Sequence, residues 1–228
     1  MAKLAEVVRS VGRPVAWRRG EALLREREAP DRVVLIVLGR VKVTAEAVNG
    51  RTGLLAVRGP GELIGEQSCV DGNPRSATAT ALEKGSGVEV GIAEFRQLLR
   101  DDPVLADVVL RAMSERLREA DRGRVRLGAL SVRARTADFL VTHMEQGPVT
   151  HAEQGGVSAV TSGVQWRVSL TQQDMAAAVG ASREQLVRVL REFSDRGWLS
   201  RNRQRPLVVL DPKSLAAAVT EPPRQGRP

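Results

Sequence analysis

The hydrophobic period of this 228-residue chain changes after Gly91, and this change constrains the fold more than any other feature. Before Gly91, short apolar runs alternate with turns rich in Gly, Asn and Pro, and no helix of ordinary length fits between the breaks. The runs cover residues 33–38, 41–43, 54–57, 77–81 and 88–90. Regular turn spacing without helical patterns is typical of antiparallel all-β architectures. We therefore expect a compact antiparallel β-barrel or sandwich between about Val15 and Val90.

After Gly91 the pattern becomes helical. Residues 93–100 predict a short helix, and Pro103, which suits a first helical turn, opens a long helix that reaches about Leu127. Such a helix carries a narrow stripe between two charged flanks. The stripe residues follow one another at alternating steps of three and four: Leu110, Met113, Leu117, Ala120, Arg124 and Leu127. The narrow stripe favours a partner helix and hence a parallel homodimer. A helix that lies on the core of its own domain is the alternative.

The end of the long helix sets the domain boundaries. Gly128 is expected to interrupt it, and Ser131 to cap a further helix from about Val132 to Glu145. The polar, Gly-rich stretch 147–163 predicts a long flexible or hairpin-like connection. We therefore expect an α+β chain with a β-roll domain at 1–101, a dimerisation helix at 102–128, a second domain at 129–220 and a disordered tail at 221–228.

Composition excludes several classes of protein. The single cysteine, Cys69, excludes a disulfide framework, a four-cysteine iron–sulfur site and a structural zinc site, and neither histidine has a partner at a ligand spacing. No nucleophile elbow, phosphate loop or Ser/His/Asp grouping is visible, so we expect no enzyme and no metal. The chain shows neither a secretory leader nor a long apolar run. These features predict a soluble cytoplasmic protein without a membrane partner.

Residues 171–193 predict a helix-turn-helix. Thr171 can cap a short helix that carries Asp174 at its third position, and Gly180 can end this helix in a tight turn. Ser182 can cap a second helix, whose inward positions would be Leu186, Val189, Leu190 and Phe193. Two short helices joined by a glycine turn are typical of a helix-turn-helix.

The outer face of the second helix indicates double-stranded DNA as a partner. The chain has a net charge of +8 and 31 of its 35 basic residues are arginine, an excess that codon bias also explains. Within Ser182–Arg205 the local net charge is +4, and arginine and glutamate can read guanine and cytosine. Residues 197–210 then read as strand, basic turn and strand. This wing would place arginines along the phosphate backbone.

The segment Thr171–Glu184, followed by Arg188 and Gly197-Trp198-Leu199, resembles the winged helix-turn-helix of the cyclic-AMP receptor protein (CRP/FNR) family of transcription regulators. The resemblance implies a regulator that binds pseudo-palindromic promoter sites as a homodimer, with bases read by the positions of Arg183, Glu184 and Arg188. It leaves an RNA polymerase contact open, and Gln185 stands where threonine is common. The expected DNA-binding set is Thr171, Gln172, Gln173, Ser182, Arg183, Glu184, Gln185, Arg188, Arg201 and Arg203.

A second motif, Pro60–Glu66 and then Gly72–Thr78, resembles the phosphate-binding cassette of cyclic-nucleotide-binding domains, a β-barrel of jelly-roll type. The resemblance implies that Glu66 takes the ribose 2′-hydroxyl and Arg75 the cyclic phosphate, with cyclic AMP as the effector. Guanidinium and hydroxyl donors suit a phosphate. The expected effector-binding set is Gly65, Glu66, Arg75, Ser76, Ala77 and Asp121. The alternative is an ion pair between Glu66 and Arg75 that staples a ligand-free barrel.

Two departures from the family pattern leave the effector open. Gln67-Ser68-Cys69 is more polar than usual, and Ala120 and Asp121 replace the threonine and serine that the cyclic-AMP receptor protein offers to adenine. The remaining alternatives are another effector, no effector, a redox response at Cys69, or a nucleotide-sensing module that acts through protein partners. For the mechanism, we expect effector binding to repack the long helix near residues 120–124. A hinge at Gly128 would then reset the separation of two recognition helices.

Overall fold

The computed structural model of the chain describes residues 2–147, 165–200 and 207–220. The chain forms two compact units, Met1–Arg124 and Val125–Pro228. In the described ranges, no helix combines the length and the apolarity needed to cross a membrane.

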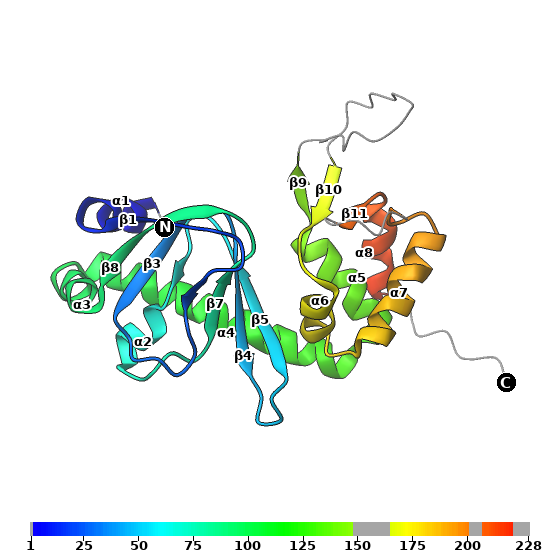
Figure 1. The fold of residues 1–228 in the computed structure, drawn as a ribbon, viewed down its shortest axis with the longest axis horizontal. Coiled ribbons are helices and arrows are strands. Elements are labelled where there is room, and N and C mark those ends of the chain that lie inside the picture. The colour runs from blue at the N-terminus through cyan, green and yellow to red at the C-terminus, as the bar shows by residue number, and fades with distance from the viewer. Residues whose placement is uncertain (1, 148–164, 201–206, 221–228) are drawn as a thin grey trace. The chain divides into compact units, whose positions relative to one another are not determined.

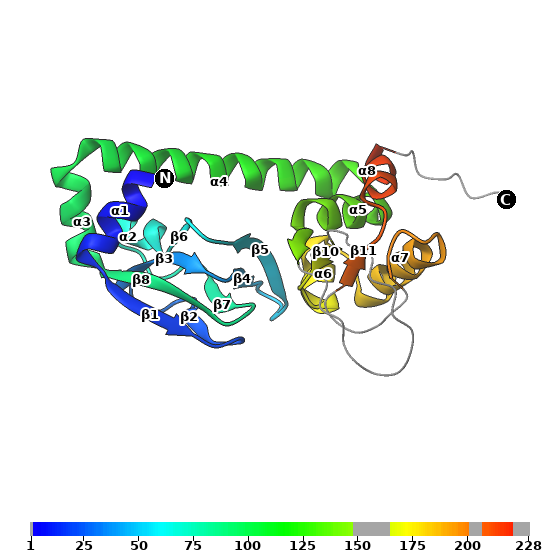
Figure 2. The ribbon, with the colours of Figure 1, turned by 90° about the horizontal axis from the view of Figure 1, so that it is seen from above.

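The first unit contains two four-stranded antiparallel sheets (Figures 1 and 2). One sheet has the order β1 (Arg13–Trp17), β8 (Gly85–Gly91), β3 (Arg32–Leu38), β6 (Leu63–Ile64). The other has the order β2 (Ala22–Leu24), β7 (Thr78–Ala81), β4 (Val41–Glu46), β5 (Thr52–Arg58). Each of the five predicted apolar runs overlaps a strand, so the expected antiparallel β-barrel is confirmed.

The core between the sheets forms around Trp17, whose side chain is buried. The indole lies against two glycines of β8. A Cβ atom added to Gly85 would lie 2.6 Å from Trp17 Nε1, and one added to Gly87 would lie 3.0 Å from the ring. These positions therefore need glycine because a large aromatic side chain covers the backbone there.

Helices close one end of the barrel. A second core cluster joins Leu4 and Val8 of α1 (Ala2–Val11), Phe95 of α3 (Ile92–Asp101) and Leu105 of α4 (Pro103–Ala129), and all four side chains are fully buried. The sequence analysis predicted α3 and α4. It assigned no element to α1, to the short strands β1, β2 and β6, or to the six-residue helix α2 (Glu66–Asp71).

Helix α4 is continuous for 27 residues, so the expected break falls after Ala129 and not at Gly128. A Cβ atom at Gly128 would meet nothing within 4 Å, and one glycine costs a helix only about 1 kcal/mol, so the helix continues to Ala129. The residues of the apolar stripe differ in burial. Met113 packs on the core cluster of the barrel, whereas Leu110 and Leu117 are 60% and 61% exposed. Part of the stripe thus lies on its own domain and part remains open.

The second unit is built on α5 (Val132–His143), α6 (Gln172–Ala178), α7 (Arg183–Asp195) and α8 (Pro212–Thr220) (Figure 1). A small sheet has the order β11 (Leu207–Val209), β10 (Gln165–Val168), β9 (Glu145–Gly147). Leu199 bridges Val209, so the two predicted wing segments pair. β9 pairs antiparallel with β10, and residues 148–163 of the predicted connection between them lie outside the described residues. The wing turn and the predicted disordered tail lie outside the described residues.

Candidate effector pocket and nucleic-acid interface

The phosphate-binding motif folds into a glycine turn followed by α2. Gly65 precedes the helix with a φ of 88°, a conformation that favours glycine. A Cβ atom there would also lie 2.7 Å from Arg75 Nη1. Glu66 is the first helical residue, and its side chain is only 6% exposed. The structure therefore brings Gly65, Glu66 and Arg75 together, as the motif implied.

Arg75 is held by three acceptors from neighbouring segments. Its side chain is 3% exposed and donates to the carbonyl oxygens of Gly65 (2.8 Å) and Arg32 (2.5 Å). It also forms an ion pair with Asp31, with 3.1 Å between Nη2 and Oδ1. Burial raises the pKa of Asp31, but the guanidinium groups of Arg32 and Arg75 outweigh this effect and hold it below its ordinary value. Asp31 thus supplies a negative charge where a cyclic phosphate would compete for Arg75.

Glu66 has a different ionic partner, Arg116 of α4. The Arg116 guanidinium forms an ion pair with Glu66 Oε1 and donates to the carbonyl oxygen of Leu63 at 2.5 Å. The alternative of an ion pair between Glu66 and Arg75 is therefore wrong, because Glu66 pairs with Arg116 and Arg75 pairs with Asp31. Glu66 Oε2 is buried and accepts no hydrogen bond from any of the described residues. A buried acceptor without a donor costs about 1–3 kcal/mol, so a hydroxyl that reached this oxygen would be favoured.

Arg116 was missed by the sequence analysis, which counted it among the charged flanks of the stripe. Its spacing contained a signal. Val109, Met113 and Arg116 follow one another at steps of four and three and therefore share one helix face, and the first two pack on the barrel. A second ion pair supports the same face, with 3.1 Å between Arg58 Nη1 of β5 and Glu119 Oε2 of α4.

The other predicted effector residues, Ser76, Ala77 and Asp121, are not part of the ion pairs around Glu66 and Arg75. Ser76 Oγ donates to Gln67 Oε1 at 3.3 Å, and Ala77 lies half-buried just before β7. Asp121 is exposed and pairs with Arg124 at 3.0 Å. Five residues of α-helix rotate Asp121 by about 140° from Arg116, so one chain does not bring Asp121 to Glu66.

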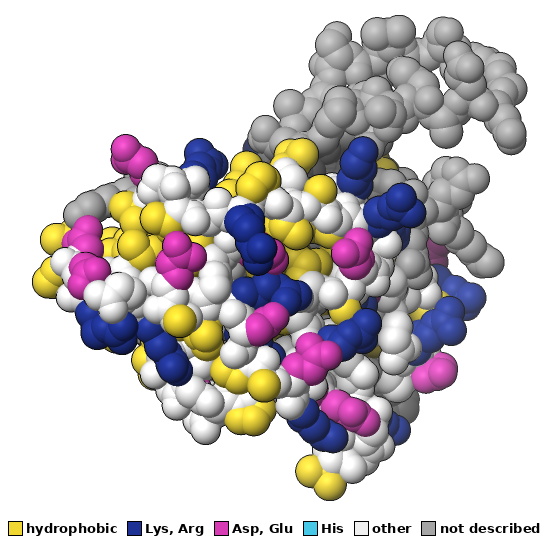
Figure 3. Space-filling view, turned by 60° about the vertical axis from the view of Figure 1, so that its left-hand side comes forward, with side chains coloured by type: hydrophobic (Ala, Val, Ile, Leu, Met, Phe, Trp, Pro, Cys, Tyr) yellow, Lys and Arg dark blue, Asp and Glu magenta, His cyan; other side chains and the backbone are white. Residues whose placement is uncertain are grey.

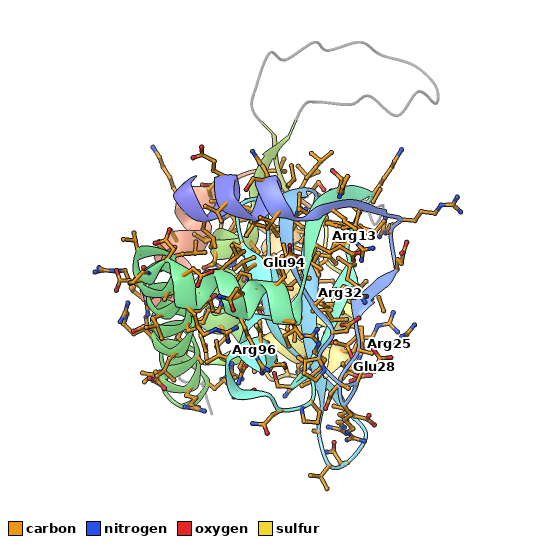
Figure 4. The ribbon with its side chains drawn as sticks, turned by 90° about the vertical axis from the view of Figure 1, so that its left-hand side faces the viewer. Arg13, Arg25, Glu28, Arg32, Glu94 and Arg96 are labelled. Atoms are coloured by element: carbon orange, nitrogen blue, oxygen red, sulfur yellow. The ribbon has the colours of Figure 1, made fainter. Side chains whose placement is uncertain are left out.

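A charged network runs from β1 to Arg75. Glu89 of β8 pairs with Arg13 at 3.3 Å and with Arg32 at 3.4 Å, and Arg32 in turn pairs with Asp31. Figure 4 shows Arg13 and Arg32 on one side of the barrel, and Arg25 and Glu28 lie on the same side. The pairs have exposed members, so the network orients Asp31 and contributes little stability.

Cys69 of α2 and a cleft elsewhere on the barrel are two further features of the first unit. Cys69 is fully buried, and burial raises the pKa of its thiol, which opposes the redox alternative because a thiolate is the reactive form. A shallow, mainly apolar cleft of about 390 Å³ is lined by Arg9, Pro14, Val15, Ala16, Val37, Ser86, Gly87 and Val88. This cleft contains none of the residues that the motif identified. In the described part of the chain, no group of three His, Cys, Asp or Glu side chains could hold a metal ion.

The helix-turn-helix is fixed by two reciprocal caps. Thr171 Oγ1 accepts from the backbone N–H of Asp174 at 2.9 Å and donates to Asp174 Oδ2 at 2.7 Å. The Ser182 N–H donates to Gln185 Oε1 at 3.0 Å, and the Gln185 N–H donates to Ser182 Oγ at 3.2 Å. Gly180 has a φ of 60° between the two helices. The predicted caps and the predicted turn are thereby confirmed.

The first turns of α7 form an exposed polar face. Arg183, Glu184, Gln185 and Arg188 are exposed, whereas Leu186 is fully buried on the opposite side. The backbone N–H of Glu184 and the Ser182 hydroxyl hold the pKa of Glu184 below its ordinary value, so the carboxylate is an acceptor near neutral pH. At the start of α6, Gln172 is half-buried and Gln173 is exposed. Arg201 and Arg203 lie outside the described residues.

Charge is mixed elsewhere on the molecule. Figure 3 shows basic and acidic side chains interspersed with apolar ones over the face that it presents. A broad basic field is therefore absent from the described part of this face, and the recognition helix must be identified by its local geometry and charge.

Comparison with known proteins assigns both units. Residues 14–102 match the family described as "Cyclic nucleotide-binding domain", and residues 134–218 match the "Crp-like helix-turn-helix domain". A "CRP-like cAMP-activated global transcriptional regulator" of Mycobacterium tuberculosis is 31% identical over 203 residues, which cover 89% of this chain and 86% of the relative. The chain belongs to the CRP/FNR family. It is a transcription regulator with a cyclic-nucleotide-binding domain followed by a DNA-binding helix-turn-helix.

Other relatives give the same family and fold. The "Cyclic AMP receptor protein" of Thermus thermophilus is 28% identical over 183 residues, covering 79% of this chain and 76% of the relative. The solved structure of FixK2 from Bradyrhizobium japonicum covers 93% of this chain and 100% of its own length, with a TM-score of 0.75. At 20% identity, this likeness shows only that this chain shares the fold of that structure.

Proposed function

We propose that this CRP/FNR regulator binds pseudo-palindromic DNA in the cytoplasm as a homodimer and that a cyclic nucleotide, with cyclic AMP first, controls it from the barrel. One observation carries the effector proposal. The buried Glu66 Oε2 has no hydrogen-bond donor, and the Arg75 guanidinium lies on the same glycine turn. A ribose hydroxyl supplies the first group, and a cyclic phosphate suits the second.

DNA recognition rests on the exposed face of α7. Arg183 and Arg188 can pair bidentately with guanine, and Glu184 can accept from cytosine. Thr171, Gln172, Gln173 and Ser182 lie at helix starts, where N–H groups and side-chain donors suit phosphates. The wing residues Arg201 and Arg203 would add contacts to the backbone. RNA polymerase would be a further partner of a regulator bound in this way.

Dimer formation rests on the open part of the α4 stripe. Leu110 and Leu117 lie seven residues apart and are each about 60% exposed, as a heptad contact requires. Paired α4 helices would cover these side chains. They would also present two α7 helices to half-sites about 34 Å apart. In the same dimer, Asp121 of one copy could accept from the base in the other copy's barrel.

Effector binding would act on two internal ion pairs. A ribose hydroxyl that donates to Glu66 Oε2 would weaken the attraction of the carboxylate for Arg116, which binds Oε1, and a cyclic phosphate would compete with Asp31 for Arg75. The first effect would act directly on α4, since Arg116 belongs to that helix. The relatives named as cAMP-activated support cyclic AMP over other nucleotides. The barrel would therefore report its occupancy to the dimerisation helix.

Calorimetric titration of the full-length chain with cyclic AMP and cyclic GMP tests the effector. We expect saturable heat with cyclic AMP, weaker binding of cyclic GMP and loss of both with Arg75→Ala. Arg100→Ala, an exposed change on α3, is the matched control. Heat that survives Arg75→Ala would show that the pocket is misassigned.

A mobility-shift assay on selected promoter DNA tests the DNA-binding surface. We expect Arg183→Ala and Arg188→Ala to abolish sequence-specific binding while the Arg100→Ala control binds as the parent does. Binding that ignores both substitutions would disprove base reading by α7. Sedimentation that gives a monomer at micromolar concentration would disprove the dimer.

A further inference from the structure

Arg135 joins three segments of the second unit through one guanidinium. Its Nη1 donates to the carbonyl oxygens of Leu130 (2.6 Å) and Leu127 (3.1 Å), at the end of α4. Its Nε donates to the Val179 carbonyl oxygen at 2.7 Å, and its Nη2 to that of Gly180 at 3.4 Å. Arg135 itself belongs to α5, so this side chain links α5, the end of α4 and the turn between α6 and α7.

The arrangement suits an arginine in particular. The last carbonyls of a helix lack intrahelical partners and carry partial negative charge, so a cation is favourable there. Arg135 satisfies this requirement for two helix ends at once, those of α4 and α6. A guanidinium is planar and its five N–H donors point in fixed directions, so it holds both ends in a defined orientation. A lysine would keep the charge but lose the fixed fork.

Two other contacts support the same joint. A Cβ atom added to Gly180 would lie 2.7 Å from Leu127 Cδ2, so Leu127 packs directly on the turn. Arg126 pairs with Asp138 of α5, with 2.7 Å between Nη1 and Oδ2. Within the second unit, α5 and the turn before α7 therefore hold the last turn of α4 on several sides.

We infer that Arg135 is a positioning residue for DNA binding, which sets the angle between the end of α4 and the recognition helix α7. Only two residues separate Gly180 from Arg183, so the turn that Arg135 holds carries the start of α7. In a dimer paired along α4, this angle fixes the distance between the two recognition helices. The half-site spacing that the dimer accepts follows from that distance. This inference rests on the proposed homodimer on pseudo-palindromic DNA.

The test compares duplexes that carry the same two half-sites at the preferred spacing and at spacings one base pair shorter or longer. Half-sites are first selected from a random library with the unmodified full-length protein, and affinity is measured by fluorescence anisotropy. We expect the unmodified protein to prefer one spacing by about tenfold or more, since each base pair shifts the site by about 3.4 Å. We expect Arg135→Gln to lose about tenfold at the preferred spacing and to bind the three duplexes almost equally.

Two further variants and one control complete the design. Arg135→Lys keeps the charge, and Leu127→Ala loosens the same joint with Arg135 intact, so both should flatten the spacing preference even if Arg135→Gln fails to fold. Arg133→Gln is the matched control on α5. Arg133 pairs with Glu192 of α7 at 2.9 Å, so its loss removes a different tie between α5 and α7 and should lower all three affinities in proportion.

The outcomes separate this inference from the proposed function. An unchanged spacing preference in Arg135→Lys and Leu127→Ala would overturn the role of Arg135 while leaving the proposed function intact. A flattened preference in Arg133→Gln as well would overturn it too, because any loosening of the unit would then suffice. If the unmodified protein selected no paired half-sites, the proposed function itself would fail and this inference with it.

Discussion

Removing Arg116 should destabilise the barrel by about 3 kcal/mol, because it leaves the Glu66 carboxylate buried without a counter-charge. Breaking a buried ion pair by deleting one partner costs about 3–5 kcal/mol. The low end applies here, since the Arg116 side chain is 24% exposed and water can reach the vacated position, whereas Glu66 is only 6% exposed. Arg116→Met also removes the hydrogen bond to the Leu63 carbonyl. Glu66→Gln should cost less, about 1–2 kcal/mol, because Arg116 keeps its hydrogen bond to the Leu63 carbonyl and its exposed part stays hydrated.

The assay needs a probe of the barrel alone. Trp17 is buried in the barrel, and the other tryptophans are Trp166 and Trp198, so a W166F/W198F background leaves one reporter. Urea unfolding followed by Trp17 fluorescence should show a midpoint lower by about 1–2 M in Arg116→Met. In a double-mutant cycle with Glu66→Gln, the two costs should fall short of additivity by at least 1.5 kcal/mol, on the order expected for coupled partners. Additive costs, or a loss below about 1 kcal/mol for Arg116→Met, would refute the ion pair as a stabilising contact.

Three further predictions follow from single residues. Arg27 is the one described non-glycine residue with a positive φ, at 69°, so Arg27→Gly should stabilise the barrel by up to about 1 kcal/mol in the same urea assay. Asp31 has a lowered pKa, so its stabilising effect is full above about pH 4 and is lost as the pH falls through its folded-state pKa. Asp31→Asn should therefore weaken the barrel slightly at pH 7, and the difference from the parent should shrink as the pH falls. Gln185→Glu keeps the acceptor of the α7 cap but loses the amide donor, so circular dichroism should be unchanged while affinity for selected DNA falls about tenfold.

Long apolar runs and caps could be predicted from the sequence because their signals are local. The run 33–38 became β3, and Ser131, Thr171 and Ser182 each cap the helix expected of them. The missed elements lack such signals. Strand β6 has two residues and β2 has three, which is too short for any alternation, and they form because longer strands offer them an edge.

The candidate effector site was predictable in its residues but not in its pairing. The motif identified Glu66 and Arg75, yet their ionic partners lie 50 and 44 positions away along the chain, in Arg116 and Asp31. Arg116 and Asp31 each lie in a segment with many other charged residues, so the sequence does not distinguish them. Only the packing of α4 and the start of β3 against the glycine turn selects them, so tertiary structure decides which charges are neutralised.

Helix α4 connects the two sites because its faces have different partners. The face with Val109, Met113 and Arg116 lies on the barrel, and the open stripe with Leu110 and Leu117 would lie on a second copy. An effector hydroxyl that donates to Glu66 Oε2 would weaken the ion pair that Arg116 forms with Oε1, and so loosen one contact of the first face. Since a helix of 27 residues moves as a stiff element, we expect that change to reach Leu127, where Arg135 and the turn at Gly180 hold it. Recognition helix and effector carboxylate would then be coupled through two arginines, each of which neutralises acceptors that the fold leaves otherwise unsatisfied.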